Sequence, residues 1–213
     1  MTYVLYYSPG TASLALHWML IELGAPFEAI KVDIEKDEQK SPDFLKINPA
    51  GHLPALVVDG KPHAEVAAML MLLAERDPER RFDVPAGSPE RADYLQRMFF
   101  LANTVQPAFR AWFYPHEPAG PEYVAPVQAM ARARLEAAFT RMDANLSDGR
   151  TYMLGERVTA LDFLAAMLIR WSRNMPKPAT DWPRLKAYAD RMRAMPSLRE
   201  VHAREGLTDW IGG

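Results

Sequence analysis

Short apolar runs alternate with helical patterns over the first third of the chain. Residues 3–7 form a β-type run that Ser8-Pro9-Gly10 ends, and residues 27–34 alternate apolar and polar side chains as a half-exposed strand does. Between these two runs, Leu14, Trp18 and Ile21 would lie on one face of a helix, which is predicted to end at Gly24. A charged stretch with a helix start follows over residues 33–46. Two strands, residues 54–58 and 61–64, are joined at Asp59-Gly60, and a buried helix covers residues 65–76. The order β-α-β-α-β-β-α predicts a compact α/β module.

The pattern changes after residue 76. Residues 77–87 are rich in charged residues, proline and glycine, which is typical of an interdomain linker. Beyond it the pattern is helical, with a first long helix starting at Ser88-Pro89 and further helices over residues 127–146, 163–171, 184–195 and from 197 onward. The fold class is therefore α/β followed by all-α: an N-terminal domain of residues 1–76, a linker of residues 77–87 and an all-helical domain of residues 88–213.

One helix start in the second domain has a recognisable cap. Thr159 followed by Asp162 is similar to a capping box, with aspartate in place of the usual glutamate. We expect Asp162 to stabilise the fold of this domain and to take no part in chemistry.

Composition and charge exclude several classes of function. The 213 residues carry a formal net charge of -2, which argues against binding to nucleic acid or to an anionic membrane surface. No apolar run approaches the roughly 20 residues that cross a bilayer, and the N-terminus lacks the pattern of a signal peptide, so we expect a cytoplasmic protein. The chain has no cysteine, and its five histidines include no His-x-x-x-His pair. We therefore expect no disulfide, no protein thiolate and no metal site.

Residues 48–60 carry the most informative local pattern. The turn sequence Asn48-Pro49-Ala50-Gly51 leads into an apolar run with Pro54 at its first position. Proline is tolerated at the start of a strand and excluded from a central one. If the Leu53–Pro54 bond is cis, the chain turns sharply and the main chain of Leu53 is free to pair with another extended peptide. The alternative is a trans proline entering an ordinary edge strand, and this segment alone leaves both open.

Four motifs occur in order along the chain. They are the opening Tyr6-Tyr7-Ser8-Pro9-Gly10-x-x-Ser13-Leu14, the loop Asn48-Pro49-x-Gly51-x-Leu53-Pro54-Ala55-Leu56, the cap Gly155-x-x-Val158-Thr159-x-x-Asp162 and the closing pattern Trp182-Pro183-x-Leu185 with Met195-Pro196-Ser197. Together they resemble the cytosolic glutathione S-transferase family over essentially the whole chain, and the opening is similar to that of its bacterial beta class.

The resemblance implies a fold and a set of partners. It implies a thioredoxin-like N-terminal domain, an all-helical C-terminal domain and a homodimer. It also implies glutathione as co-substrate, with no tightly bound cofactor. In this setting the order of elements around Leu53–Pro54 favours the cis bond.

The sequence departs from the beta-class pattern at three places. Ala12 stands where members commonly have a cysteine, and Val66 replaces the serine that follows the acidic residue at the third helix start. Gln106-Pro107 replaces a His-Lys pair on the first long helix of the second domain. The chain therefore has no thiol of its own, and glutathione would bring the reacting one.

Ser13 and Tyr7 are the candidates for activating that thiol. A free thiol has a pKa near about 8.5, is mostly protonated at neutral pH and reacts as the thiolate. A hydroxyl or N–H donor favours the anion, as does a nearby helix N-terminus. Ser13 stands at the predicted start of the first helix and Tyr7 at the end of the first strand. The alternatives are a capping role for Ser13, a core role for Tyr7, and Tyr6 as the hydroxyl instead.

The resemblance implies that most residues that bind glutathione lie in the first domain. The Leu53 main chain would pair with the cysteinyl residue, the Glu65 carboxylate would bind the γ-glutamyl ammonium group, and N–H groups of Glu65 and Val66 would bind the α-carboxylate. His52 and Lys36 are candidates for the glycyl carboxylate, and the alternative for each is a side chain that only faces solvent. The full predicted set for glutathione is Ala12, Lys36, His52, Leu53, Pro54, Glu65, Val66, Asn103 and Gln106.

The first long helix of the second domain carries a polar stripe. Asn103, Gln106 and Arg110 lie at i, i+3 and i+7, which puts three polar groups on one face of an otherwise apolar segment. This face is either a solvated stripe or the lining of an interdomain cleft, with Pro107 bending the helix. The residues predicted for an apolar electrophile pocket are Arg110, Trp112, Phe113 and Trp171.

The sequence therefore predicts a glutathione transferase that conjugates the glutathione thiolate to small apolar electrophiles. Two alternatives stay open: a glutathione-dependent peroxidase or reductase that uses no protein thiol, and a non-catalytic glutathione-binding or scaffold protein of the same fold. The expected partners are glutathione, a small hydrophobic electrophile and a second copy of the chain.

Overall fold

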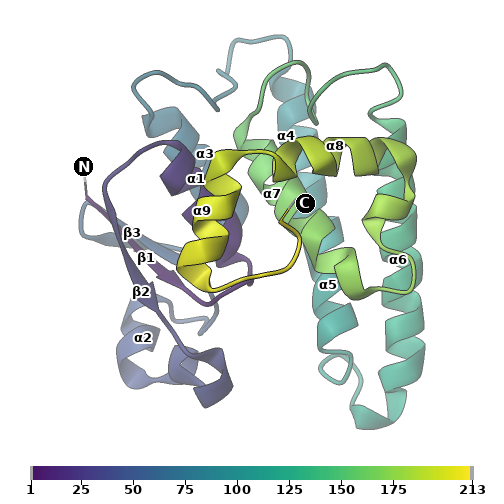
Figure 1. The fold of residues 1–213 in the computed structure, drawn as a ribbon. Coiled ribbons are helices and arrows are strands. Elements are labelled where there is room, and N and C mark those ends of the chain that lie inside the picture. The colour runs from purple at the N-terminus through teal and green to yellow at the C-terminus, as the bar shows by residue number, and fades with distance from the viewer. Residues whose placement is uncertain (1, 212–213) are drawn as a thin grey trace. The chain divides into compact units, whose positions relative to one another are not determined.

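The computed structural model describes residues 2–211 and forms two compact units (Figure 1). The first unit runs to Asp83 and also contains the chain from Arg193 onward, while the second unit spans Val84–Met192. The last helix of the chain is therefore part of the first unit. The domain boundaries that the sequence places at residues 76 and 87 stay predictions.

A four-stranded sheet lies at the centre of the first unit. The strand order is β2-β1-β3-β4; β1 and β2 are parallel, and β3 pairs antiparallel with both β1 and β4. The strands are Tyr3–Tyr7 (β1), Phe27–Lys31 (β2), Ala55–Val58 (β3) and Lys61–His63 (β4). The helices of this unit are Ser13–Glu22 (α1), Pro42–Ile47 (α2), Val66–Arg76 (α3) and Pro196–Glu205 (α9). The predicted order β-α-β-α-β-β-α of a thioredoxin-like fold is confirmed.

Alternate side chains of β1 pack against opposite faces of the sheet. Tyr7, on the same face as the fully buried Leu5, has its ring 5.0 Å from that of His17 on α1. Tyr6, on the other face, packs edge-on against Phe44 of α2 with ring centroids 5.8 Å apart. The helices α1 and α2 therefore cover opposite faces of the sheet (Figure 1).

The second unit is built from helices. Its α-helices are Arg91–Phe100 (α4), Gln106–Phe113 (α5), Val124–Ala144 (α6), Ala160–Trp171 (α7) and Pro183–Arg193 (α8). A π-helical turn, Leu101–Val105, joins α4 to α5, and Pro107, the second residue of α5, has no main-chain N–H to donate. No helix within residues 2–211, the long α6 included, is apolar enough over its length to cross a bilayer.

Several predicted boundaries are wrong by two or three residues, and two of them have a clear local cause. β2 ends before residue 34 because Asp33 accepts a hydrogen bond from the Glu35 N–H and starts a 3₁₀ turn. The helix α4 begins at Arg91 and not at Ser88, because the Ser88 hydroxyl donates to the Pro85 carbonyl within a turn. In both places a short polar side chain bonds to a nearby main-chain group and competes with regular structure.

Asp162 holds the start of α7. Its buried carboxylate accepts hydrogen bonds from the Thr159 N–H at 2.8 Å and the Thr159 hydroxyl at 3.0 Å. It also accepts from the Met153 N–H at 2.9 Å and the Tyr188 hydroxyl at 3.1 Å. Burial raises the pKa of Asp162, and these four bonds act against that rise. The predicted capping role of Asp162 is confirmed.

Candidate functional site

The strand register brings several chain ends to one edge of the sheet. β1 ends at Tyr7, and the preceding Tyr6 pairs with Ala55, the first residue of the antiparallel β3. Pro54, just before β3, therefore lies at the edge where β1 ends. β2 runs parallel to β1 and pairs its last residue, Lys31, with Tyr7, so it ends here too.

Two helices begin at the same edge. β4 ends with His63 paired to Leu56, near the start of β3, so the residues that open α3 follow at this edge. The helix α1 begins directly after the turn that follows β1. We call this edge, formed by Tyr7, Ser13, Leu53, Glu65 and Val66, the strand-end edge.

The loop before β3 is held by Asn48. This buried side chain donates from Nδ2 to the His52 carbonyl at 2.7 Å and accepts from the Ala50 N–H at 3.2 Å. The Leu53–Pro54 bond is cis, which confirms the form that the surrounding elements favour. The Leu53 main chain has no hydrogen bond to any other residue within 2–211. Its N–H and C=O are therefore open to another extended peptide.

Lys40 supports the same loop and is missing from the predicted set. Its ammonium group donates to the Gly51 carbonyl at 2.9 Å. Gly51 has a φ of +63°, and a Cβ there would lie 2.9 Å from Lys40 Nζ and 3.1 Å from the Gln39 carbonyl oxygen. Nothing in the charged sequence around Lys40 distinguishes it from its neighbours, so only the folded loop identifies it.

Glu65 presents a carboxylate on an unusual backbone. Its φ of +68° and ψ of 100° lie in a region that costs about 1–3 kcal/mol for a residue with a Cβ. The side chain is exposed and forms no hydrogen bond or ion pair within the described residues. Val66 follows as the first residue of α3, where main-chain N–H groups lack helical partners. A carboxylate beside free N–H donors can bind both charges of an α-amino acid group.

The turn between β1 and α1 contains a closed cluster of hydroxyls. Ser13 is fully buried, and its hydroxyl donates to the Ser8 carbonyl at 3.0 Å. The Ser8 N–H donates back to Ser13 Oγ at 3.3 Å, and the Thr11 hydroxyl lies 2.8 Å from that oxygen. These contacts occupy the Ser13 hydroxyl inside the turn. Ala12, one of the residues predicted to bind glutathione, is buried just before α1.

Thr11 is the hydroxyl of this turn that the sequence reasoning missed. It is half-buried, and its Oγ1 donates to the Ser8 carbonyl at 2.8 Å. The available signal is its place two residues before Ser13 in the same turn.

Tyr7 carries a hydroxyl that the fold leaves open. Its side chain is half-buried, and no hydrogen bond among residues 2–211 involves its hydroxyl group. Burial raises the pKa of Tyr7, and the negative charge of Glu205 raises it further. The phenol therefore stays protonated at neutral pH and can donate a hydrogen bond.

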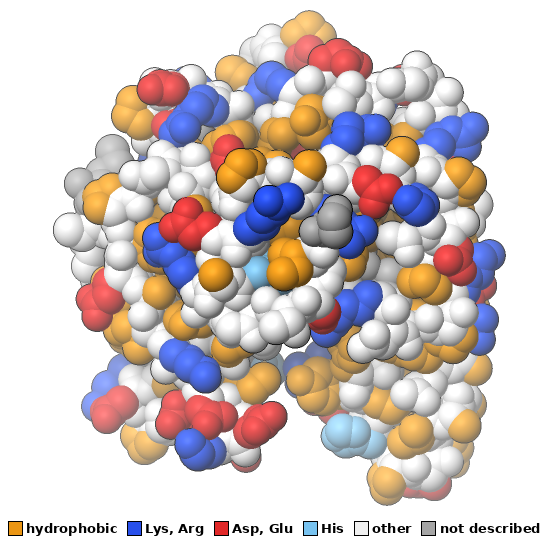
Figure 2. Space-filling view, viewed as in Figure 1, with side chains coloured by type: hydrophobic (Ala, Val, Ile, Leu, Met, Phe, Trp, Pro, Cys, Tyr) orange, Lys and Arg blue, Asp and Glu red, His pale blue; other side chains and the backbone are white. Residues whose placement is uncertain are grey.

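Lys36 and His52 lie in loops that lead to this edge. The exposed Lys36 ammonium pairs with Asp33 at 2.9 Å, and this hydrogen bond raises the pKa of Lys36. Figure 2 shows basic and acidic side chains intermingled over α2 and the turns before it. His52 is exposed, and its carbonyl accepts the Asn48 amide. Lys36 thus has a partner in the fold already.

In the second unit the predicted polar stripe is divided. Asn103 is exposed on the π-helical turn and Gln106 is half-buried at the start of α5. Arg110 forms an ion pair with Glu117, and its guanidinium carbon lies 4.1 Å from the centroid of the Tyr114 ring. The Arg110 charge is therefore already engaged within this unit.

Two of the predicted pocket aromatics pack together. The rings of Phe113 and Trp171 lie 5.9 Å apart, and both contact the buried Phe109, at 5.8 and 5.6 Å. Phe113 is 46% exposed, so this cluster reaches the surface as an apolar rim. Trp112, on the same helix, is half-buried.

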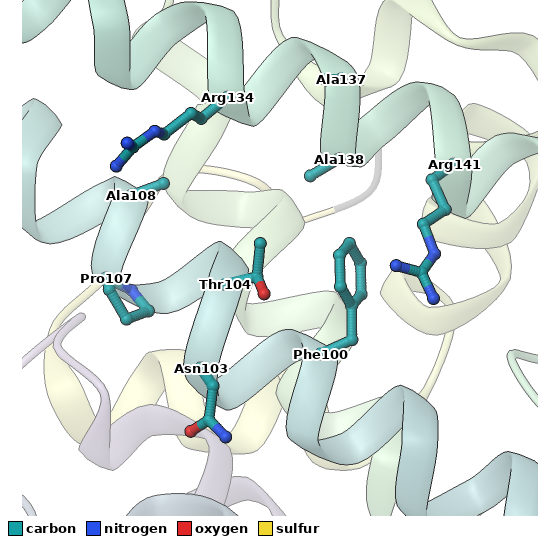
Figure 3. Close-up of a pocket in the computed structure, with 9 residues that line it drawn as sticks. All are labelled: Phe100, Asn103, Thr104, Pro107, Ala108, Arg134, Ala137, Ala138 and Arg141. Carbon is teal, nitrogen blue, oxygen red and sulfur yellow. The ribbon is translucent and has the colours of Figure 1, made fainter.

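A pocket of about 440 Å³ lies elsewhere in the second unit, against α6 (Figure 3). Its lining residues are Phe100, Asn103, Thr104, Pro107, Ala108, Arg134, Ala137, Ala138 and Arg141. The Arg141 guanidinium lies 4.2 Å from the Phe100 ring centroid. Asn103 lines this pocket without Gln106 or Arg110, so the structure does not bring the predicted stripe into one pocket.

Comparison with known proteins identifies the family. The protein-family model described as "Glutathione S-transferase, N-terminal domain" matches residues 11–76. The family model described as "Glutathione S-transferase, C-terminal domain" matches residues 99–191. Glutathione S-transferase GST-4.5 of Xanthomonas campestris pv. campestris is 31% identical over 207 residues, which cover 95% of this chain and 98% of that protein.

Solved structures agree with the sequence matches. A sphingomonad glutathione S-transferase in complex with glutathione is 31% identical with a TM-score of 0.84, covering 96% of this chain and 100% of that one. A beta-class glutathione S-transferase of Sphingomonas chungbukensis is 29% identical, also with a TM-score of 0.84 and the same coverage. The chain therefore belongs to the glutathione S-transferase family, with bacterial beta-class structures among its neighbours.

Proposed function

We propose that this protein binds glutathione at the strand-end edge and conjugates its thiolate to small apolar electrophiles. The relative from Xanthomonas is a glutathione S-transferase by name, and the sphingomonad structure holds glutathione. Both are about 30% identical to this chain over nearly its full length, which supports the same co-substrate here.

One observation carries the proposal. The main chain of Leu53 has no partner among residues 2–211, and Glu65, at the same edge of the sheet, has a carboxylate without a partner. An extended peptide with a zwitterionic end would use both at once. The Leu53 N–H and C=O would pair with the cysteinyl residue of glutathione. The Glu65 carboxylate would bind its ammonium group, and the Val66 N–H would bind its α-carboxylate.

We assign thiol activation to Tyr7. Its open, protonated hydroxyl would donate to the sulfur and favour the thiolate, whereas the Ser13 hydroxyl is bonded within its own turn. The thiol proton passes to solvent. The thiolate then attacks an electrophilic carbon, a C–S bond forms and the leaving group departs with its electron pair. No residue of this chain is oxidised or reduced in the step.

The helical unit is the proposed source of contacts to the electrophile. The exposed rim of Phe113, packed on Trp171, offers aromatic surface that suits an apolar acceptor. Trp112 is the further aromatic candidate, and Arg110 is a candidate at its edge. A homodimer, which the family resemblance implies, and the cytoplasmic location expected from the sequence are part of the proposal.

The test is binding to immobilised glutathione together with turnover of a halogenated nitroaromatic. We expect retention on the resin, elution by free glutathione and enzymatic formation of the conjugate. Retention without turnover of any electrophile tested would favour the non-catalytic alternative. Turnover of a hydroperoxide but not of the nitroaromatic would favour the peroxidase alternative. Failure of both binding and turnover would refute the proposal.

A further inference from the structure

The last residue of α9 is a buried glutamate. The Glu205 carboxylate is wholly inaccessible to solvent. Its Oε1 lies 2.8 Å from Nδ1 of His17, which is itself 1% exposed, and its Oε2 accepts a hydrogen bond from the Gly10 N–H at 2.8 Å. Burial of a carboxylate is unfavourable unless hydrogen bonds or an opposite charge replace its lost hydration. Each oxygen of Glu205 has a hydrogen-bond partner, His17 on one and Gly10 on the other.

These two partners belong to the turn and the helix that follow β1. Gly10 lies in the turn of Ser8 to Ser13, which contains the closed hydroxyl cluster. His17 lies on α1, and its ring is 5.0 Å from the ring of Tyr7 and 5.5 Å from that of Phe27. Glu205 therefore contacts both the turn and the side chain that packs on Tyr7.

A second contact fixes the other end of α9. The indole N–H of Trp18, on α1, donates to the Ser197 hydroxyl in the first turn of α9 at 2.8 Å. Figure 1 shows α1 and α9 together in the first unit, and the two helices pack against each other. The C-terminal helix is thus held to α1 at its start and to the β1–α1 turn at its end.

We propose that Glu205 is a positioning residue for thiol activation. By accepting the Gly10 N–H and holding His17, it fixes the β1–α1 turn and the orientation of Tyr7 at the strand-end edge. It acts through these groups and not by contact with glutathione. The inference rests on the proposed function only in naming what is positioned, because the contacts themselves exist without ligand.

The test compares two variants of Glu205 with a matched control in the full-length protein. Glu205→Gln keeps one acceptor oxygen and loses the charge, and Glu205→Ala removes both contacts. The control is Glu200→Gln, which alters an exposed glutamate on the same helix that pairs with Arg204. The first readout is amide hydrogen exchange at Thr11 and Ser13, measured by NMR without ligand. Neither amide bonds to Glu205, since they donate to Ser8 and Thr11 within the turn.

We expect exchange at these amides to rise about tenfold or more in Glu205→Gln, the scale of losing one charge-assisted hydrogen bond. Exchange at these amides should be faster still in Glu205→Ala, and in Glu200→Gln it should equal that of the unaltered protein. The second readout is kinetic. Both Glu205 variants should raise the thiol pKa of bound glutathione and lower kcat several-fold, with KM for glutathione nearly unchanged, because Leu53 and Glu65 are intact.

The two hypotheses fail in different ways. If the unaltered protein neither binds nor turns over glutathione, the proposed function fails, and the exchange readout still tests the role of Glu205. If Glu205→Ala does not fold, Glu205→Gln decides. Exchange at Thr11 and Ser13 that is the same in Glu205→Gln and Glu200→Gln would overturn the inference, as would a loss confined to KM.

Discussion

Replacing Glu65 by glutamine tests how the strand-end edge binds the γ-glutamyl ammonium group of glutathione. The exposed Glu65 carboxylate has no partner within residues 2–211, so the substitution breaks no contact of the folded protein. We therefore expect the free energy of unfolding to change by less than about 0.5 kcal/mol. Affinity should fall, because the γ-glutamyl ammonium group loses its only negatively charged partner in the proposed complex.

The magnitude follows from the exposure of the side chain. A hydrogen bond to a charged group contributes about 1.5–3 kcal/mol. An exposed carboxylate stays well hydrated before binding, which places Glu65 at the lower end of that range. About 1.5 kcal/mol corresponds to roughly a tenfold higher dissociation constant for glutathione.

The assay is calorimetric titration with two ligands, glutathione and an analogue that lacks the γ-glutamyl amino group. Glu65→Gln should weaken glutathione about tenfold and the analogue very little, since the analogue has no ammonium group to lose. Glu75→Gln, an exposed change on the same helix, is the control and should bind both ligands as the unaltered protein does. Equal weakening of both ligands, or none, would refute the assigned contact.

Four further changes separate residues proposed for the chemistry from residues that support the fold. Tyr7→Phe should leave the melting temperature nearly unchanged, lower kcat about tenfold and raise the thiol pKa of bound glutathione, which is measured from thiolate absorbance. Ser13→Ala should instead lower the free energy of unfolding by about 1–3 kcal/mol, because it leaves the Ser8 N–H buried without an acceptor. Its effect on kcat should be smaller than that of Tyr7→Phe. The reverse ranking would assign the chemistry to Ser13. Asn48→Ala should weaken glutathione binding and lower the free energy of unfolding by about 1–3 kcal/mol, because the His52 carbonyl and the Ala50 N–H both lose their partner. An unchanged affinity for glutathione would show that the loop does not need the Asn48 side chain. Asp162→Ala should lower the free energy of unfolding, measured in urea, by about 3–5 kcal/mol, because four buried donors share the Asp162 carboxylate as their acceptor. A loss under about 1 kcal/mol would contradict the capping role of Asp162.

Local patterns predicted the elements of this fold well. β1 was predicted at its observed bounds, and Asp59-Gly60 joins β3 to β4 as expected. These features depend on residues close in sequence: an apolar run, a turn dipeptide or a cap. The Thr159–Asp162 cap is confirmed for the same reason.

The candidate site was less predictable, because its geometry depends on distant residues. The sequence left Ser13 and Tyr7 equal, and only the folded turn shows that the Ser13 hydroxyl donates to the Ser8 carbonyl. The sequence gives no hint that Glu205 bonds the Gly10 N–H across a separation of 195 residues. The edge itself could be inferred, because its residues follow strand ends, whereas the contacts that fix their orientation could not.

A crystal structure of the glutathione complex tests the central claim most directly. The account predicts the cysteinyl main chain paired with Leu53, the ammonium group on Glu65 and the sulfur within about 3.2 Å of the Tyr7 hydroxyl. Glutathione bound away from the strand-end edge, or bound there with its sulfur beyond reach of Tyr7, would contradict it.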